Sequence, residues 1–200
     1  MTKLINHTYT KILEVIRTQP HLNLRGVIEQ TRLSPNVTSA CVNNLVKKNV
    51  LIENRLQKKR VYMRQFMLNH RSPLAQALFL LVEEEKKCVF YQKHPRLNAI
   101  AEQIISAFPK ISSLVLYGSY AKDVETKDSD LDMLIIGSLK NKERLQEIFV
   151  TLETEPSIKI ESPAQFKFKQ HDPLHQEILK HHVVLYDVKI FMKQMLANAR

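Results

Sequence analysis

Apolar residues recur at helical spacing in three segments near the start of the chain. Residues 8–18 carry one such stripe, and a shorter one follows at 22–28. Ser34-Pro35 supplies a helix N-cap followed by proline at the first helical position, which predicts a third helix over residues 35–48. Within this third helix a spacing of four predicts an inward face formed by Val37, Cys41 and Leu45.

Two short apolar runs follow, and they predict a β-hairpin. Residues 50–56 and 61–66 read as strands around the basic tip 57–60. The net charge of +10 is concentrated in this part of the chain. Residues 1–70 carry +9, residues 71–110 carry +2 and residues 111–200 carry −1. A block of cations indicates phosphate binding, so the N-terminal third is expected to face nucleic acid, with a solvated surface as the alternative.

Three helices followed by a hairpin resemble a winged helix-turn-helix domain. The recognition helix would span residues 34–48 and the wing residues 55–60. The resemblance implies binding of duplex DNA through residues 1–70, because a recognition helix reads base edges while a wing contacts the backbone. A protein-facing or homodimer-forming role for the same module stays open. The predicted DNA-binding residues are Asn36, Ser39, Asn43, Lys47, Lys58, Lys59 and Arg60.

A pair of helices is predicted to connect this module to the rest of the chain. Ser72-Pro73 starts the first, in which the charge run 83–87 is expected to be solvated, and residues 97–108 form the second. The expected domains are 1–70, the connecting helices 71–110, and 111–200. No apolar run is long enough to span a bilayer and the first residues do not resemble a secretory signal, so a cytoplasmic protein without membrane contact is expected.

The pattern changes to strand, turn and short helix from Ser113 onward. Residues 114–117 form an apolar run, Gly118 and Ser119 follow at once, and residues 120–124 can form one or two helical turns. Glycine permits a phosphate to approach the backbone, and the serine adds a hydroxyl donor. The same pattern also occurs in ordinary turns, so by itself it is a weak signal.

Two aspartates at the start of the next apolar strand make the signal stronger. Strand alternation places Asp130 and Asp132 on one face. Two like charges repel there, and aspartate is disfavoured in strands, so a cation between them is the expected reason for the pair. Mg²⁺ suits carboxylate oxygens and completes its shell with water and substrate phosphates. A solvated acidic strand end is the alternative.

Gly118-Ser119 followed after ten residues by Asp130-Leu131-Asp132 resembles the signature of the DNA polymerase beta nucleotidyltransferase superfamily, in its minimal nucleotidyltransferase branch. The resemblance implies that Gly118 and Ser119 hold the nucleotide and that Asp130 and Asp132 are catalytic metal ligands. The implied fold class is α+β, with an N-terminal winged helix-turn-helix followed by a small nucleotidyltransferase domain that has a mixed sheet flanked by helices. Asp123 stands where many members have glycine.

Members of this family usually supply a third carboxylate from a later strand, which here is the segment 157–161. Ile158 and Ile160 are expected to face the core, leaving Lys159 and Glu161 on the site face. Alignment to the family puts Lys159 at the acidic position. Either Glu161 substitutes as a catalytic acid, or Lys159 marks weakened or absent catalysis with nucleotide binding retained.

The family resemblance implies a Mg²⁺-dependent enzyme that uses ATP or another nucleoside triphosphate. It would transfer a nucleoside monophosphate, most plausibly AMP, to a hydroxyl of a macromolecule, and a helical HEPN-type toxin is the partner to be sought if the chain is an antitoxin. The rival is a DNA-binding regulator whose inactive nucleotidyltransferase domain senses nucleotide. The histidines near the C-terminus, which are His171, His175, His181 and His182, are expected in the core or on the surface rather than in a metal site.

Overall fold

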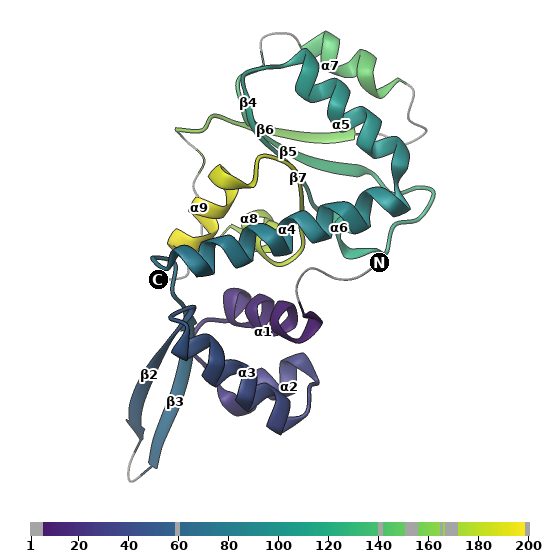
Figure 1. Cartoon of the computed structure of the whole chain (residues 1–200). Coiled ribbons are helices and arrows are strands. Elements are labelled where there is room, and N and C mark those ends of the chain that lie inside the picture. The colour runs from purple at the N-terminus through teal and green to yellow at the C-terminus, as the bar shows by residue number, and fades with distance from the viewer. Residues whose placement is uncertain are drawn as a thin grey trace. The chain divides into compact units, whose positions relative to one another are not determined.

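The computed structural model describes residues 6–58, 61–139, 142–150, 156–164, 166 and 172–198. The described residues belong to two compact units, one of residues 6–82 with 196–198 and one within residues 83–195. Helix α4 contributes residues to both units (Figure 1). None of the helices in the described ranges is long and apolar enough to cross a membrane.

The N-terminal unit contains three helices and a small antiparallel sheet. Its first part comprises α1 (His7–Thr18), β1 (Leu22–Asn23), α2 (Leu24–Thr31) and α3 (Pro35–Lys47), and the hairpin strands are β2 (Leu51–Lys58) and β3 (Val61–Leu68). The side chains of Asn6, Asn23 and Ser34 each accept a hydrogen bond from a backbone N–H in the first turn of the helix that follows. Asparagine and serine at these positions satisfy donors that a helix start leaves unpaired.

Two local predictions for this unit are wrong. Leu22 and Asn23 do not begin the second helix but pair with β3, because the Asn23 side chain caps α2 from outside it. Leu45 on α3 is buried as predicted, but the other inward positions are shifted by one residue to Thr38 and Val42, and Val37 is 43% exposed. Thr38 can be buried because its hydroxyl donates to the Ser34 carbonyl at 2.9 Å. The winged helix-turn-helix assignment itself stays a prediction.

A partly buried acid connects the two hairpin strands of the N-terminal unit. Glu53 on β2 accepts hydrogen bonds from Arg64 on β3 at 2.6 Å and from Arg55 at 2.9 Å, and its side chain is only 13% exposed. The Arg64 guanidinium also lies over the Phe66 ring, 5.2 Å from its centroid. The hydrogen bond from Arg64, and then that from Arg55, hold the pKa of Glu53 below its ordinary value of 4.5.

Glu53→Gln should therefore destabilise the hairpin by about 1 kcal/mol at neutral pH, since Arg64 is partly exposed and the charged hydrogen bonds are screened. A carboxylate with a lowered folded pKa stabilises the protein above its unfolded pKa, so this contribution should be lost as pH falls below about 4.5. Hydrogen exchange of β2 and β3 amides in the full chain measures both effects. Glu29→Gln, which breaks an exposed pair with Arg25, is the control and should change little. Equal protection in wild type and Glu53→Gln would contradict the prediction.

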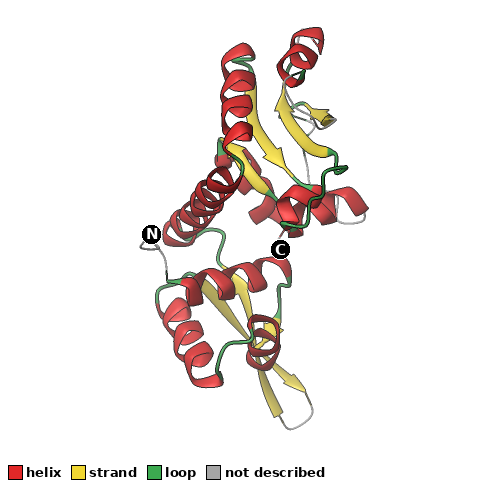
Figure 2. Ribbon diagram, turned by 90° about the vertical axis from the view of Figure 1, so that its right-hand side faces the viewer, coloured by secondary structure: helices red, strands yellow, loops and turns green. Residues whose placement is uncertain are grey.

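The C-terminal unit is a mixed four-stranded sheet covered by helices on both faces (Figure 2). The strand order is β6-β5-β4-β7, in which β5 and β6 are parallel and the other neighbours are antiparallel. The predicted α+β fold class with a mixed sheet in this region is thus confirmed. The elements are α4 (Pro73–Lys93), α5 (Pro95–Ala107), β4 (Ile111–Leu116), α6 (Gly118–Lys122), β5 (Leu131–Gly137), α7 (Lys142–Phe149), β6 (Pro156–Glu161), α8 (Pro173–Lys180), β7 (Val183–Tyr186) and α9 (Val188–Asn198).

Each face of this sheet has its own apolar core. One core joins Leu116, Met133 and Ile135 to residues of α4, α5 and α7. The other joins Val115, Leu134 and Ile136 to residues of α8 and α9 and to Phe166. Strand alternation along β5 therefore sends Asp132 toward the face covered by α8 and α9, together with Leu134.

Helix α4 corrects one further expectation. Glu83, the first residue of the charge run 83–87, is fully buried rather than solvated. Its carboxylate lies 3.2 Å from Nε2 of His182, which is also buried. The sequence pattern does not show this pairing, because His182 lies 99 positions further along the chain than Glu83.

Candidate active site

The predicted nucleotide turn lies directly against the second predicted metal ligand. Gly118 is buried and has φ +71°, a left-handed conformation that favours glycine. A Cβ built on Gly118 would lie 2.1 Å from Oδ2 of Asp132. The backbone N–H of Tyr117 donates to the carbonyl of Asp132 at 3.0 Å, which holds the turn and β5 together. The absence of a side chain at position 118 thus leaves room for the Asp132 carboxylate.

The two aspartates lie at the beginning of β5, in different environments. Asp130 precedes the strand and is exposed, whereas Asp132 is half-buried. Burial is the main cause that raises the pKa of Asp132, and the negative charges of Asp130 and Glu177 raise it further. The Ser157 side chain opposes this shift through a hydrogen bond, and the cation of Lys122 opposes it to a smaller extent.

The chemistry of these residues fits a Mg²⁺ ion. The negative charges of Asp130 and Asp132 repel each other, and the Asp132 carboxylate lies where a Cβ on Gly118 would otherwise be. A hard divalent cation would offset the repulsion between them and lower the pKa of Asp132 again. Asp130 and Asp132 would hold this ion.

Strand β6 shows which residue lies beside Asp132. The parallel register pairs Asp132 with Ser157, Leu134 with Lys159 and Ile136 with Glu161. Ile158 and Ile160 pack against the core on the other face, as the sequence predicts. Ser157 is therefore the residue of β6 that lies beside Asp132, and the assignment of the third-acid position stays a prediction.

Glu161 lies further along the same strand. It is four residues beyond Ser157, about 13 Å at the usual strand rise. Its Oε1 lies 3.0 Å from Nζ of Lys159 and 3.4 Å from Nε2 of His175, a fully buried ring. A catalytic role for Glu161 stays a prediction. The two ion pairs are contacts that the sequence does not indicate.

Two charged side chains near the site are missing from the sequence interpretation. Lys122 at the end of α6 forms a 2.5 Å ion pair with Glu177 on α8. The Glu177 charge raises the pKa of Asp132, and the Lys122 charge lowers it. Nothing in the pattern of α8 places it beside α6. The contact depends on how α8 packs on the sheet, which is a long-range feature.

Ser157→Ala should move the acid limb of Mg²⁺ binding to higher pH. The Ser157 hydroxyl lies within hydrogen-bonding reach of Asp132 and of the buried Tyr117 hydroxyl, and it lowers the pKa of both groups. Its removal raises the pKa of Asp132 further, so a higher pH is needed to ionise this ligand. Mg²⁺ affinity measured against pH tests the shift, with the exposed Ser138→Ala as control. Superimposable pH profiles for Ser157→Ala and wild type would argue against this role.

The residues predicted to contact DNA are only partly described. Asn36, Asn43 and Lys47 are exposed on α3, and Ser39 is half-buried. The Asn43 side chain accepts a hydrogen bond from Arg64 at 2.7 Å. The side chain of Lys58, and all of Lys59 and Arg60, lie outside the described residues, as does His171.

Comparison with known proteins finds one family whose profile covers the site segment. The profile of the family described as "Polymerase beta, Nucleotidyltransferase" matches residues 99–190, which include the Gly-Ser turn and both aspartates. A solved structure described as "Crystal structure of the toxin-antitoxin with AMP-PNP" shares 18% sequence identity, with a TM-score of 0.39, over 51% of this chain and 82% of its own. No curated protein matches the chain.

Proposed function

We propose that the protein is a Mg²⁺-dependent nucleotidyltransferase, because the profile of the polymerase beta nucleotidyltransferase family matches residues 99–190. It transfers a nucleoside monophosphate, AMP from ATP, to a hydroxyl of a macromolecular acceptor. The observation that carries the proposal is the close packing of Gly118 on the Asp132 carboxylate, because it joins the nucleotide turn to the metal ligands. The choice of ATP as the donor and of a macromolecular hydroxyl as the acceptor rests on the resemblance of the Gly-Ser and Asp-Leu-Asp motif to the family.

The reaction needs an attacking hydroxyl, a bound triphosphate and a leaving pyrophosphate. The acceptor oxygen forms a bond to the α-phosphorus, the bond from that phosphorus to the β-phosphate oxygen breaks, and the hydroxyl proton passes to solvent. Mg²⁺, when bound, activates the hydroxyl and stabilises charge on the pyrophosphate. Asp130 and Asp132 hold the ion, while Gly118 and Ser119 receive the outer phosphates.

Transfer of an α-phosphate label from ATP tests the proposal in the full chain. Wild type should label an acceptor, such as a candidate HEPN-type toxin, in the presence of Mg²⁺. Asp130→Asn/Asp132→Asn should lose at least about 1,000-fold in rate, since both ligands of a catalytic metal are changed. Asp128→Asn changes an exposed acid in the same loop and should retain activity.

A nucleotide-sensing regulator is the second candidate, and Ser157 beside Asp132 favours it, since no acid occupies that position. In this case the protein binds Mg²⁺ and ATP through Asp130 and Asp132 but transfers no label to any acceptor. ATP binding that is lost in Asp130→Asn/Asp132→Asn, without transfer by wild type, would select the regulator.

The N-terminal unit is proposed to bind duplex DNA. The support is its net charge of +9 over residues 1–70 and the exposed Asn36, Asn43 and Lys47 on α3. A salt series on the full chain should show affinity that falls steeply with salt. Neutralising Lys58, Lys59 and Arg60 should weaken binding and reduce the salt dependence. Affinity that is indifferent to both changes would exclude this role.

A further inference from the structure

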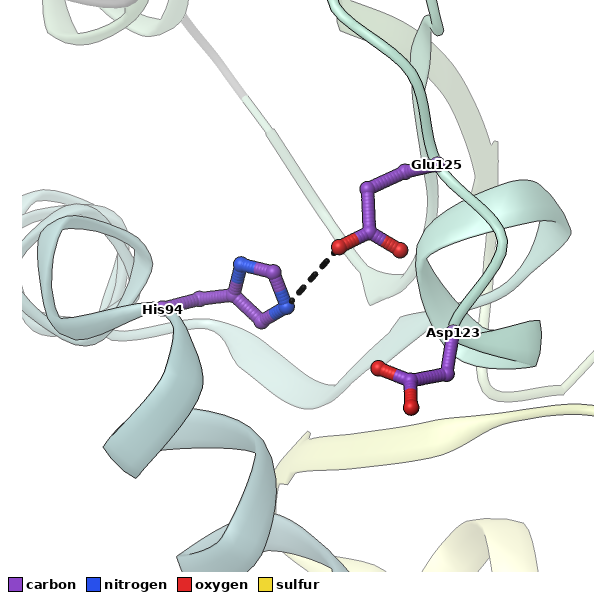
Figure 3. Close-up of side chains that lie close together, drawn as sticks. All are labelled: His94, Asp123 and Glu125. Atoms are coloured by element: carbon purple, nitrogen blue, oxygen red, sulfur yellow. Dashed lines mark ion pairs between the residues drawn. The ribbon is translucent and has the colours of Figure 1, made fainter.

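A second group of metal-ligand side chains lies in the C-terminal unit, apart from the two aspartates. His94 lies between α4 and α5, and Asp123 and Glu125 lie in the loop that follows α6 (Figure 3). Each residue offers one ligand atom, and these atoms lie within 4.8 Å of one another. The imidazole and the Glu125 carboxylate face each other across the group (Figure 3).

The His94 ring is held in place by its neighbours. Its backbone N–H donates to the Phe90 carbonyl at 2.9 Å, and Pro95 follows directly. The Phe90 ring lies 4.6 Å from the imidazole, centroid to centroid, and Tyr120 approaches at 5.7 Å in an edge-to-face arrangement. Contacts on two sides fix the direction of the ring, as a preformed ligand requires.

Two polar atoms in this group are buried without hydrogen-bond partners among the described residues. They are Nε2 of His94 and Oε2 of Glu125. A buried imidazole nitrogen or carboxylate oxygen that lacks a partner costs free energy of desolvation. A cation bound between the two side chains would give Nε2 of His94 a partner.

The spacing of the two facing groups suits a metal better than a hydrogen bond. Nε2 of His94 lies 3.4 Å from Oε1 of Glu125. Two ligands about 2.1 Å from a tetrahedral Zn²⁺ are separated by about 3.4 Å. This pair therefore already has the separation of one edge of a Zn²⁺ coordination tetrahedron. Asp123 must approach by a side-chain rotation to complete the set.

Asp123 occupies a backbone position that favours glycine. Its φ is 61°, in the left-handed region, which aspartate adopts more readily than most other non-glycine residues. Oδ2 of Asp123 lies 2.5 Å from Nζ of Lys93. With one carboxylate oxygen on this lysine, Asp123 can offer the other oxygen to a metal, and the Lys93 cation competes with the metal for the carboxylate charge.

We propose that His94, Asp123 and Glu125 bind a divalent transition-metal ion of the Zn²⁺ class, at a site separate from the Mg²⁺ ligands Asp130 and Asp132. An imidazole nitrogen with two carboxylate oxygens suits Zn²⁺, whereas Mg²⁺ prefers oxygen ligands throughout. The bound ion would fasten the loop after α6, and with it the helix that begins at Gly118, to the corner between α4 and α5. Water completes the coordination.

Zn²⁺ binding to the purified full chain tests this site independently of any activity. With Mg²⁺ in excess, calorimetry should show one Zn²⁺ bound by wild type and by Asp130→Asn/Asp132→Asn. His94→Asn and the isosteric Glu125→Gln should each lose at least about 100-fold in affinity, since even an outer-shell partner is worth about 10- to 100-fold. Lys93→Gln removes the competing cation and should tighten binding. Asp128→Asn is the matched control and should bind as wild type does.

Co²⁺ gives a second readout, because intense visible absorption reports tetrahedral coordination with few ligands. The absorption should appear in wild type and disappear in Glu125→Gln, whose circular dichroism should remain that of the folded protein. Three results would each overturn the site: no Zn²⁺ bound by wild type, undiminished affinity in both His94→Asn and Glu125→Gln, or loss of the ion in Asp130→Asn/Asp132→Asn.

Discussion

Gly118→Ala is expected to reduce nucleotidyl transfer by at least about 100-fold, because a displacement of about 1 Å at a reacting centre can cost this much. The new Cβ would lie 2.1 Å from Oδ2 and 2.9 Å from Cγ of Asp132, far inside van der Waals contact. Either the carboxylate or the turn must move. The φ of +71° adds backbone strain for alanine, of about 1 kcal/mol. Metal binding and nucleotide binding should therefore fall together.

The measurement combines the label-transfer rate with Mg²⁺ and ATP affinities and a thermal melt. Gly26→Ala, in the N-terminal unit, is the matched control. The atom nearest to its Cβ would be at the flexible end of the Leu22 side chain, at 2.8 Å. It should leave transfer unchanged. Gly118→Ala with wild-type Mg²⁺ affinity and wild-type transfer would show that the carboxylate does not need its position against the turn.

The local order of the active-site segment could be predicted from sequence because its signals are short-range. An apolar run, a Gly-Ser turn and two aspartates at the beginning of a strand lie within 24 residues, and strand alternation places Asp132 on one face. The helix starts at Ser34-Pro35 and Pro73 are also local signals, and the structure begins α3 and α4 there. Each of these features depends on backbone preferences within one or two turns of chain.

Features that depend on packing between distant segments could not be predicted. The alignment favours Lys159 at the third-acid position, but the β5–β6 register puts Ser157 beside Asp132. A shift of two residues keeps the same face of the strand, so alternation cannot distinguish these positions. The paths of two loops bring together His94, Asp123 and Glu125. Their spacing in the sequence matches no metal-binding motif.

The buried pair of Glu83 and His182 leads to the largest stability effect that we expect. Nδ1 of His182 lies 2.7 Å from the Ile178 carbonyl, which can only accept, so Nδ1 carries a proton. Nε2 then faces Oε2 of Glu83 at 3.2 Å, and this contact is attractive only if the pair holds a further proton. Lys86 also approaches Glu83, at 3.3 Å. Both members of the pair are fully buried side chains.

Glu83→Ala should therefore lower the free energy of unfolding by about 3 kcal/mol, because it removes one partner of a buried ionisable pair and leaves a cavity. The chain has no tryptophan, so urea unfolding of the full chain followed by circular dichroism, with hydrogen exchange of β7 amides, measures the loss. Glu84→Ala, one residue along α4, breaks only a partly exposed pair with Lys87 and should cost about 0.5 kcal/mol or less.

Replacing both partners, as Glu83→Met with His182→Phe, should recover most of the loss, because apolar side chains of similar volume need no partner. If Glu83→Ala were as stable as Glu84→Ala, the carboxylate would not stabilise the packing of α4 on this unit.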